Sequence, residues 1–394
     1  MRGVIAFNLY NGVSLQMGVS VFDLIIFAFF ALIFALGVVT ALFPAVFGLK
    51  RHNLSDRYTW GLNVQGFLFL STVACGILVV ISASIIIKDT DSFTVFLHAV
   101  ADVPGILVRI DPLIGIIFQL AATIAFGCLI GAQMLMALDL GRPFRALKII
   151  TGRNLASPLT LDFILLIVLT GLSFVFMFGI FMNVHEILIL WAYATLFLSL
   201  LCMLAHVMLF ILKAAPGLGT RSFESVTTVA CGIWSGSAVI SLFMPFHHSF
   251  AGVFLIATML VFASQVAVFI GCFAAGKKPY NLTLTSISFV VLIFLVARTL
   301  FMAQHVWIVS VIYVFVCILA IVAVFIEKIE TVLNHQKLPV LPAPYNMYDK
   351  VKAYRPSIPE VGGLVAGFSL VVCIFYAVVI FRAYALPWII NLFL

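Results

Sequence analysis

The chain has 394 residues, of which 64% are hydrophobic and 9% are charged, and its mean hydropathy is +1.27. Because a soluble domain is only about half apolar, this composition excludes a soluble globular protein and predicts one that is embedded in a membrane. The formal net charge of +7 does not indicate a nucleic-acid partner, because the cations gather in loops on one side of the predicted spans.

Ten apolar runs are long enough for a bilayer-spanning helix, which needs roughly 20 residues. They cover residues 20–48, 60–87, 112–138, 158–183, 187–212, 226–246, 250–275, 281–303, 306–326 and 362–392. None alternates with a period of two, so a transmembrane barrel is excluded. The sequence predicts an all-α polytopic membrane protein with about ten transmembrane helices.

An internal similarity suggests how these helices are grouped. The segment from Ser71 to Ile77, STVACGI, resembles the segment from Thr227 to Ile233, TTVACGI. The second to fifth and sixth to ninth spans could therefore be two repeated four-helix bundles with flanking helices, although both segments could simply supply small residues for close packing. The predicted parts are an accessory span and loop (1–57), a first bundle (58–225), a second bundle (226–326), and a long polar loop with the last span (327–394).

The cations define one membrane face. The loops at 49–59, 139–157, 213–225, 276–280 and 327–361 fall on the same side of ten spans and hold 16 of the 21 Lys and Arg residues. We call this side the cation-rich face. The positive-inside rule predicts that it is cytoplasmic and that both termini of this multi-pass plasma-membrane protein lie outside. A partner docked on the same cations would weaken that orientation.

Intramembrane polar side chains are candidates for function, because lipid penalises them. At a rise of about 1.5 Å per residue, five of them lie within roughly 10 Å of the cation-rich face, in the second to fifth spans. They are Asn63, Gln133, Asp139, Asp162 and His206. Gln65 is close to Asn63 but points to the opposite helix face. This convergence predicts a small polar pocket in the first bundle.

The chemistry of such a pocket fits a quinone. Quinone reduction moves two protons with two electrons, so a titratable group is needed beside the ring oxygen, and Asp162 or His206 could serve as that acid or base. Asn63, Gln65, Gln133, Asp139 and Arg142 would line the quinone site. Asp162 could instead pair with Arg142 or Arg145 and hold the loop, His206 could bond a neighbouring helix, and Gln133 could join helices.

A second polar set lies in the predicted second bundle and offers a candidate proton route. Its members are Glu224, Gln265, His247, His248 and Arg298. The alternative is that the histidines are ordinary interfacial residues and that Arg298 extends its charged end to the membrane surface.

Several motifs together resemble the polysulfide-reductase (NrfD-type) family of membrane subunits, in its ten-span branch. They are Asp139-Leu-Gly-Arg-Pro143, Ser157-Pro158 with Asp162, Tyr58-Thr-Trp-Gly61, His247-His-Ser-x-x-Gly252, Arg298, and Pro356-Ser357 with Glu360. The resemblance implies a subunit without its own metal or haem that exchanges electrons between a membrane quinone, menaquinone or similar, and a ferredoxin-like iron–sulfur subunit. That partner would dock at the LGRP loop and lead to a molybdopterin, hydrogenase or similar catalytic subunit. Many relatives carry the partner outside the cytoplasm, whereas the charges here place this face inside.

Two other functions compete with this one. A haem-binding cytochrome b needs axial histidines that face each other across helices, and His206 is the sole histidine deep in a predicted span. An ion-coupled secondary transporter could use the repeats and Asp162, but no corresponding pair of Gly- or Pro-broken spans is seen. The seven cysteines lie singly in predicted spans, which supports neither disulfides nor an iron–sulfur site.

Overall fold

The structure of the chain is a computed structural model that describes residues 8–9, 13–14, 21–46, 61–99, 112–139, 158–182, 185–212, 221–243, 248–274, 282–301, 307–336 and 355–393. Within these ranges ten helices are long and apolar enough to cross a membrane, which confirms the predicted all-α polytopic fold. The helices are α1 (Val21–Val46), α2 (Leu62–Ala99), α3 (Pro112–Asp139), α5 (Pro158–Met182), α6 (His185–Leu212), α7 (Arg221–Phe243), α8 (His248–Ala274), α9 (Leu282–Phe301), α10 (Trp307–Gln336) and α11 (Ile358–Phe393). Two short antiparallel strands, β1 (Asn8–Leu9) and β2 (Val13–Ser14), precede them.

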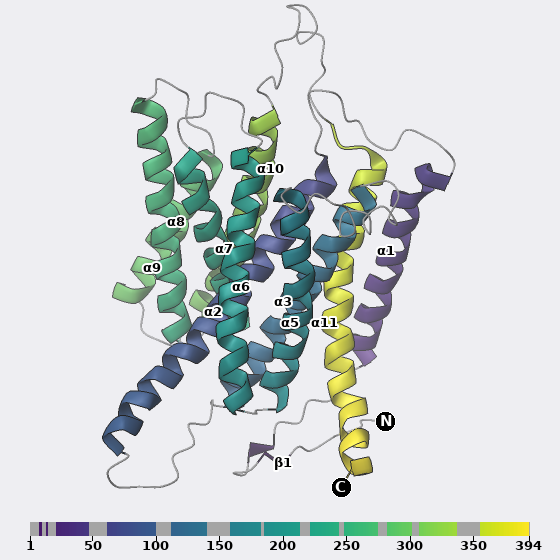
Figure 1. Cartoon of the computed structure of the whole chain (residues 1–394), viewed down its shortest axis with the longest axis vertical. Coiled ribbons are helices and arrows are strands. Elements are labelled where there is room, and N and C mark those ends of the chain that lie inside the picture. The colour runs from purple at the N-terminus through teal and green to yellow at the C-terminus, as the bar shows by residue number, and fades with distance from the viewer. Residues whose placement is uncertain are drawn as a thin grey trace, which may run out of the picture.

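Two rings of four helices form the body of the protein. In Figure 1 the helices are seen from the side, with α8 and α9 at one edge and α11 and α1 at the other. In the first bundle α2 packs on α3, α3 on α5, α5 on α6, and α6 on α2. In the second bundle α7 packs on α8, α8 on α9, α9 on α10, and α10 on α7. The division into bundles follows the predicted order of spans, and the exact residue limits of the predicted domains stay a prediction.

The two bundles meet along α2 and α7, the two helices that carry the repeated segments. A methyl group added to Gly76 would overlap the backbone of Gly232, the residue that corresponds to it in the second segment. The corresponding glycines therefore lie against each other where the helices cross. This is the close backbone approach that small residues allow in membrane bundles, so the similarity has at least the simpler role that the sequence suggested.

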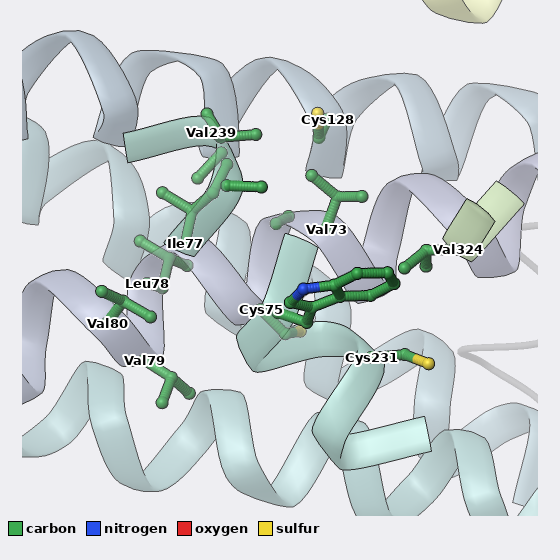
Figure 2. Close-up of a cluster of buried hydrophobic side chains, with 14 of the residues drawn as sticks. Val73, Cys75, Ile77, Leu78, Val79, Val80, Cys128, Cys231, Val239 and Val324 are labelled. Carbon is green, nitrogen blue, oxygen red and sulfur yellow. The ribbon is translucent and has the colours of Figure 1, made fainter. Parts of the chain in front are cut away.

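The core surrounds α2. In its span 78% of residues are buried, against 6% in the span of α1, so α2 is central and α1 is peripheral. Figure 2 shows Val73, Cys75 and Ile77 of α2 beside Cys231 and Val239 of α7, in the apolar cluster that joins the bundles. All seven cysteines are buried as free thiols, as expected for packing residues.

Helices α11 and α1 flank the first bundle. α11 packs on α3 and α2, and α1 packs on α11 (Figure 1). The sequence S-I-P-E starts α11 with a capping box: the Ser357 backbone N–H and hydroxyl donate to Glu360 Oε2 at 2.7 and 2.8 Å, and the Glu360 N–H donates to Ser357 Oγ at 3.4 Å. One of the motifs that carried the family resemblance thus has a local structural role.

The predicted loop from 327 to 361 is wrong at its start. Helix α10 continues to Gln336, and its apolar span reaches Leu333. Because Glu327 and Lys328 are charged, they appeared to end the span in the sequence. Both side chains are buried, at 2% and 1% exposure, so Lys328 is a membrane-helix residue and not one of the loop cations.

Candidate functional site

Asp162 and His206 lie together in the middle of the first bundle. Asp162 belongs to the first turns of α5 and His206 to the last two turns of α6, so both are near the cation-rich face. The Asp162 Oδ1 atom is 3.5 Å from His206 Nδ1, and the two side chains are 0% and 1% exposed. The structure therefore brings together the two residues that the sequence proposed for proton transfer.

A third residue, Ser71 of α2, completes the cluster. Its Oγ atom is 2.7 Å from His206 Nε2, and the Phe67 ring lies beside the imidazole with centroids 5.8 Å apart. His206 Nδ1 is also 2.7 Å from the Cys202 carbonyl oxygen. The neighbours of Nδ1 are thus a carbonyl and a carboxylate, which only accept hydrogen bonds, so Nδ1 must carry a hydrogen.

The hydrogen bond between Ser71 and the other ring nitrogen, Nε2, can be made in two ways. Ser71 has one hydroxyl hydrogen, and its Oγ lies 2.7 Å from the Phe67 carbonyl oxygen as well as 2.7 Å from His206 Nε2. Ser71 either donates to the neutral imidazole, or donates to Phe67 while a protonated His206 donates to Ser71. Rotating one hydroxyl therefore accommodates the gain or loss of a proton on His206.

The order Asp162, His206, Ser71 resembles that of a hydrolase triad, in which the histidine bridges an acid and a nucleophile. Ser71 is 0% exposed and its hydroxyl also faces the Phe67 and Leu68 carbonyls. It lies inside a continuous helix, whose backbone N–H groups are used in helix hydrogen bonds and cannot form an oxyanion hole. The arrangement fits a proton relay better than a nucleophilic site.

Asp162 has unused hydrogen-bonding capacity. Neither carboxylate oxygen has a hydrogen-bond partner among the described residues, although the side chain is fully buried. A buried polar group without a partner is costly, so such groups mark places where a ligand, a water or a proton is expected. Asp162 lies about 6 Å along the helix axis from the start of α5. A ligand that enters from the cation-rich face can therefore reach it.

Gln133 joins helices and does not contact this cluster. Its Nε2 atom donates to the Leu166 carbonyl oxygen at 3.2 Å and to Thr170 Oγ1 at 2.5 Å, both on α5. These contacts lie about one to two turns deeper than Asp162 on the same helix. The structure supports the alternative that Gln133 connects α3 to α5.

Asn63 and Gln65 are buried in different directions. Asn63 is 2% exposed and packs on α11, where a methyl group added to Gly363 would come within 2.6 Å of Asn63 Oδ1. Gln65, 1% exposed, lies two residues later and so on nearly the opposite face of α2. Asn63 Oδ1 and Gln65 Nε2 lack hydrogen-bond partners among the described residues. No contact between described side chains joins either residue to Asp162.

Other predicted site residues fall outside the described side chains. Asp139 is the last residue of α3, and its side chain is not among those described. Arg142 and Arg145 lie outside the described residues, so the alternative ion pair between Asp162 and one of these arginines stays a prediction.

Only part of the predicted route in the second bundle falls on described side chains. Gln265 Nε2 donates to Thr227 Oγ1 at 3.2 Å, and Arg298 places its guanidinium 4.0 Å from the centroid of the Tyr313 ring. Glu224 and His248 are in helices but their side chains are not described, and His247 lies outside the described residues. Arg298 is thus held inside the bundle by an aromatic ring, contrary to the idea that it extends to the membrane surface.

Sequence reasoning missed Ser71 as a site residue and missed the Glu327–Lys328 pair. A serine in a run of small residues carries no signal of its own, and only its distance to His206 identifies it. Glu327 and Lys328 could have been found, because the apolar residues Ile329, Val332 and Leu333 continue at helical spacing beyond them.

The described part of the chain has no group of three or more His, Cys, Asp or Glu side chains placed to hold a metal ion. No protein-family model and no curated protein matches the chain. The family resemblance therefore depends on the motifs alone.

Proposed function

We propose that the chain is the quinone-reactive membrane subunit of a respiratory oxidoreductase. It exchanges electrons between a membrane quinone or quinol, menaquinone or similar, and an iron–sulfur subunit. The observation that carries the proposal is the buried cluster of Asp162, His206 and Ser71, close to one membrane face, with Asp162 oxygens that lack a hydrogen-bond partner among the described residues.

The cluster supplies what quinone chemistry requires of a protein. Reduction of a quinone consumes two electrons and two protons and converts both ring carbonyls into hydroxyl groups, so each oxygen must receive a proton. Asp162 can donate a proton to a quinone oxygen or accept one from it. The charge of a protonated His206, whose Nδ1 lies 3.5 Å from Asp162 Oδ1, would stabilise the Asp162 carboxylate, while Ser71 reorients its hydroxyl at Nε2. Oxidation of a quinol would run the same steps in reverse.

The electrons come from or go to a partner. The motifs shared with polysulfide-reductase-type subunits imply a ferredoxin-like iron–sulfur subunit on the cation-rich face, and through it a molybdopterin, hydrogenase or similar catalytic subunit. Asp162 and His206 lie about 6 and 9 Å from the helix ends at that face, which keeps the transfer distance short. By the positive-inside rule we place this face in the cytoplasm of the cell and both termini outside.

The test is the substitution Asp162→Asn, made in the chain and measured in the complex that the chain forms with its redox partners. Asn keeps the size of the side chain but cannot exchange a proton, so quinone-linked turnover should fall by about 100-fold or more, in the range of general acid–base contributions. Activity of the catalytic partner with an artificial dye should not change.

The matched control is Glu330→Gln on α10. Gln keeps an oxygen that can accept the 2.9 Å hydrogen bond from Thr283 Oγ1, and it should retain quinone-linked turnover. Normal quinone turnover in the Asp162→Asn complex would remove Asp162 from the mechanism. A chain that purifies without any redox partner would count against the proposed function as a whole.

An ion-coupled secondary transporter is the second candidate. It is favoured by the two rings of four helices, whose corresponding glycines meet between the bundles, because transporters are often built from such repeats. Ion-dependent solute uptake by liposomes that contain the chain alone would support this candidate and would not be expected of a quinone-reactive subunit.

A further inference from the structure

A charged pair lies inside the second bundle. The Lys328 Nζ atom is 2.9 Å from Glu327 Oε2, and the two residues are 1% and 2% exposed. Thr331 Oγ1 donates to the second carboxylate oxygen, Glu327 Oε1, at 2.9 Å. The pair lies about 13 Å from the end of α10 at the cation-rich face and inside the apolar span of this helix, Val309–Leu333.

The pair lies where the two bundles meet. Helix α10 packs on both α7 and α2, and Phe325 makes an edge contact with Phe69 of α2 at 5.1 Å between centroids. Cys231 is near the crossing of α2 and α7, and it is labelled in Figure 2.

A group of hydroxyl and amide side chains lies one helical turn from Cys231. Thr227 Oγ1 is 3.3 Å from Ser264 Oγ, and Gln265 Nε2 donates to Thr227 at 3.2 Å. Gln265 is 1% exposed, and its Oε1 atom has no hydrogen-bond partner within the described ranges. This group can pass a proton between α7 and α8, and its free acceptor shows that its hydrogen bonding is incomplete.

Polar groups continue toward the other face. The Trp234 Nε1 atom donates to Thr258 Oγ1 at 2.9 Å, in the middle of α7 and α8. Beyond them Arg298 lies over the Tyr313 ring, with its guanidinium 4.0 Å from the ring centroid. Glu327 and Tyr313 are 14 residues apart on α10, or about 21 Å, which is most of the hydrocarbon thickness of about 30 Å.

We propose that the second bundle is a proton path and that the Glu327–Lys328 pair is its charge-exchanging site. The Lys328 ammonium passes a proton to the Glu327 carboxylate, which leaves a neutral amine and a neutral carboxyl group. The amine then takes a proton from the cation-rich face, and the carboxyl group releases one toward the hydroxyl groups of α7 and α8. The ion pair is restored, one proton has moved, and no electron or co-reactant is consumed.

If the Glu327–Lys328 pair only supports the fold, a different experimental result is expected. Replacing a buried ion pair by neutral side chains of similar size is often harmless, whereas removing one partner leaves an uncompensated charge. The informative variant is therefore the double substitution Glu327→Gln with Lys328→Met, which removes both charges and their protons together. If the pair only supports the fold, this variant should behave like the wild type.

The experiment uses the full chain in liposomes of phosphatidylethanolamine and phosphatidylglycerol. A potassium gradient with valinomycin sets an inside-negative potential, and trapped pyranine reports proton entry. Wild-type vesicles should acidify several-fold faster than protein-free vesicles, and the double variant should fall to the protein-free rate. The control Glu330→Gln, on the same helix, should keep the wild-type rate.

Three results would overturn the proposal: wild-type vesicles no faster than protein-free ones, a double variant as fast as wild type, or loss of flux in the control. Should the double variant fail to fold, Glu327→Asp carries the test. It keeps both charges but shortens the carboxylate side chain, so proton entry should slow, and an unchanged rate would contradict the proposal. No quinone is present in this assay, so its outcome is separate from that of the proposed quinone chemistry.

Discussion

Replacing Gly76 with Ala tests the contact that joins the two bundles. The added methyl group would overlap the backbone carbonyl of Gly232 on α7, and backbone atoms in a helix cannot rotate away. Gly171 on α5 is the matched control, because a methyl group there meets no atom within 4 Å. Both substitutions put alanine in a helix interior, so they differ mainly in what the methyl group touches.

The expected loss follows from two opposing effects. Alanine favours a helix over glycine by about 1 kcal/mol, and an extra methyl group in a packed interior costs about 1 to 3 kcal/mol. Since the overlap at Gly76 is with backbone, the upper value applies and the net loss is about 2 kcal/mol. Gly171→Ala should be neutral or gain up to about 1 kcal/mol. Gly232→Ala should lose less than Gly76→Ala, because its methyl group meets the flexible end of Met203.

The assay is unfolding of the purified chain by titration from a mild detergent into sodium dodecyl sulfate, followed by tryptophan fluorescence. The Gly76 variant should unfold at a lower fraction of dodecyl sulfate than the Gly171 variant. Equal stability of the two variants would mean that α2 and α7 do not approach as closely as the structure has them.

Two further substitutions test individual hydrogen bonds. Gln133→Leu removes the bonds to Leu166 and Thr170, and it should cost about 1 kcal/mol, as interhelical bonds in membranes do, while quinone-linked turnover by the complex stays normal; loss of turnover in a stably folded variant would return Gln133 to the quinone site. Glu360→Ala removes the capping box of α11 and should cost about 1 kcal/mol. Hydrogen exchange should then be faster in the first turn of α11 than in its middle, and unchanged exchange there would show that the cap adds no stability.

The sequence predicted part of the candidate site. Charged and polar residues are rare in this chain, so Asp162 and His206 stood out, and counting residues from the helix ends placed them at similar depth. Depth does not specify direction. Asn63 is at a similar depth but packs on α11, and Gln133 bonds to α5 below Asp162. Only the packing of helices separates the residues that meet from those that merely share a level.

Charge misled the prediction at α10. Glu327 and Lys328 are adjacent, and charged residues are rare inside a membrane span because lipid penalises them. Because they neutralise each other at 2.9 Å, the helix continues inside the bundle for about two more turns. Whether two charges compensate each other depends on rotamers and neighbours, which a hydropathy profile does not contain.

The amino-acid sequence by itself determined that ten helices of the described chain are long and apolar enough to cross a membrane, because the length of each apolar run matches the thickness of a bilayer. The tertiary structure alone decided which helices are neighbours, that Ser71 completes the cluster of Asp162 and His206, and that α2 and α7 meet at Gly76 and Gly232. The physical reason is that helices that are apolar on every side carry no hydrophobic stripe to mark their inner face. Their arrangement is chosen by close packing of small residues and by a few polar contacts, and both depend on residues far apart in the chain.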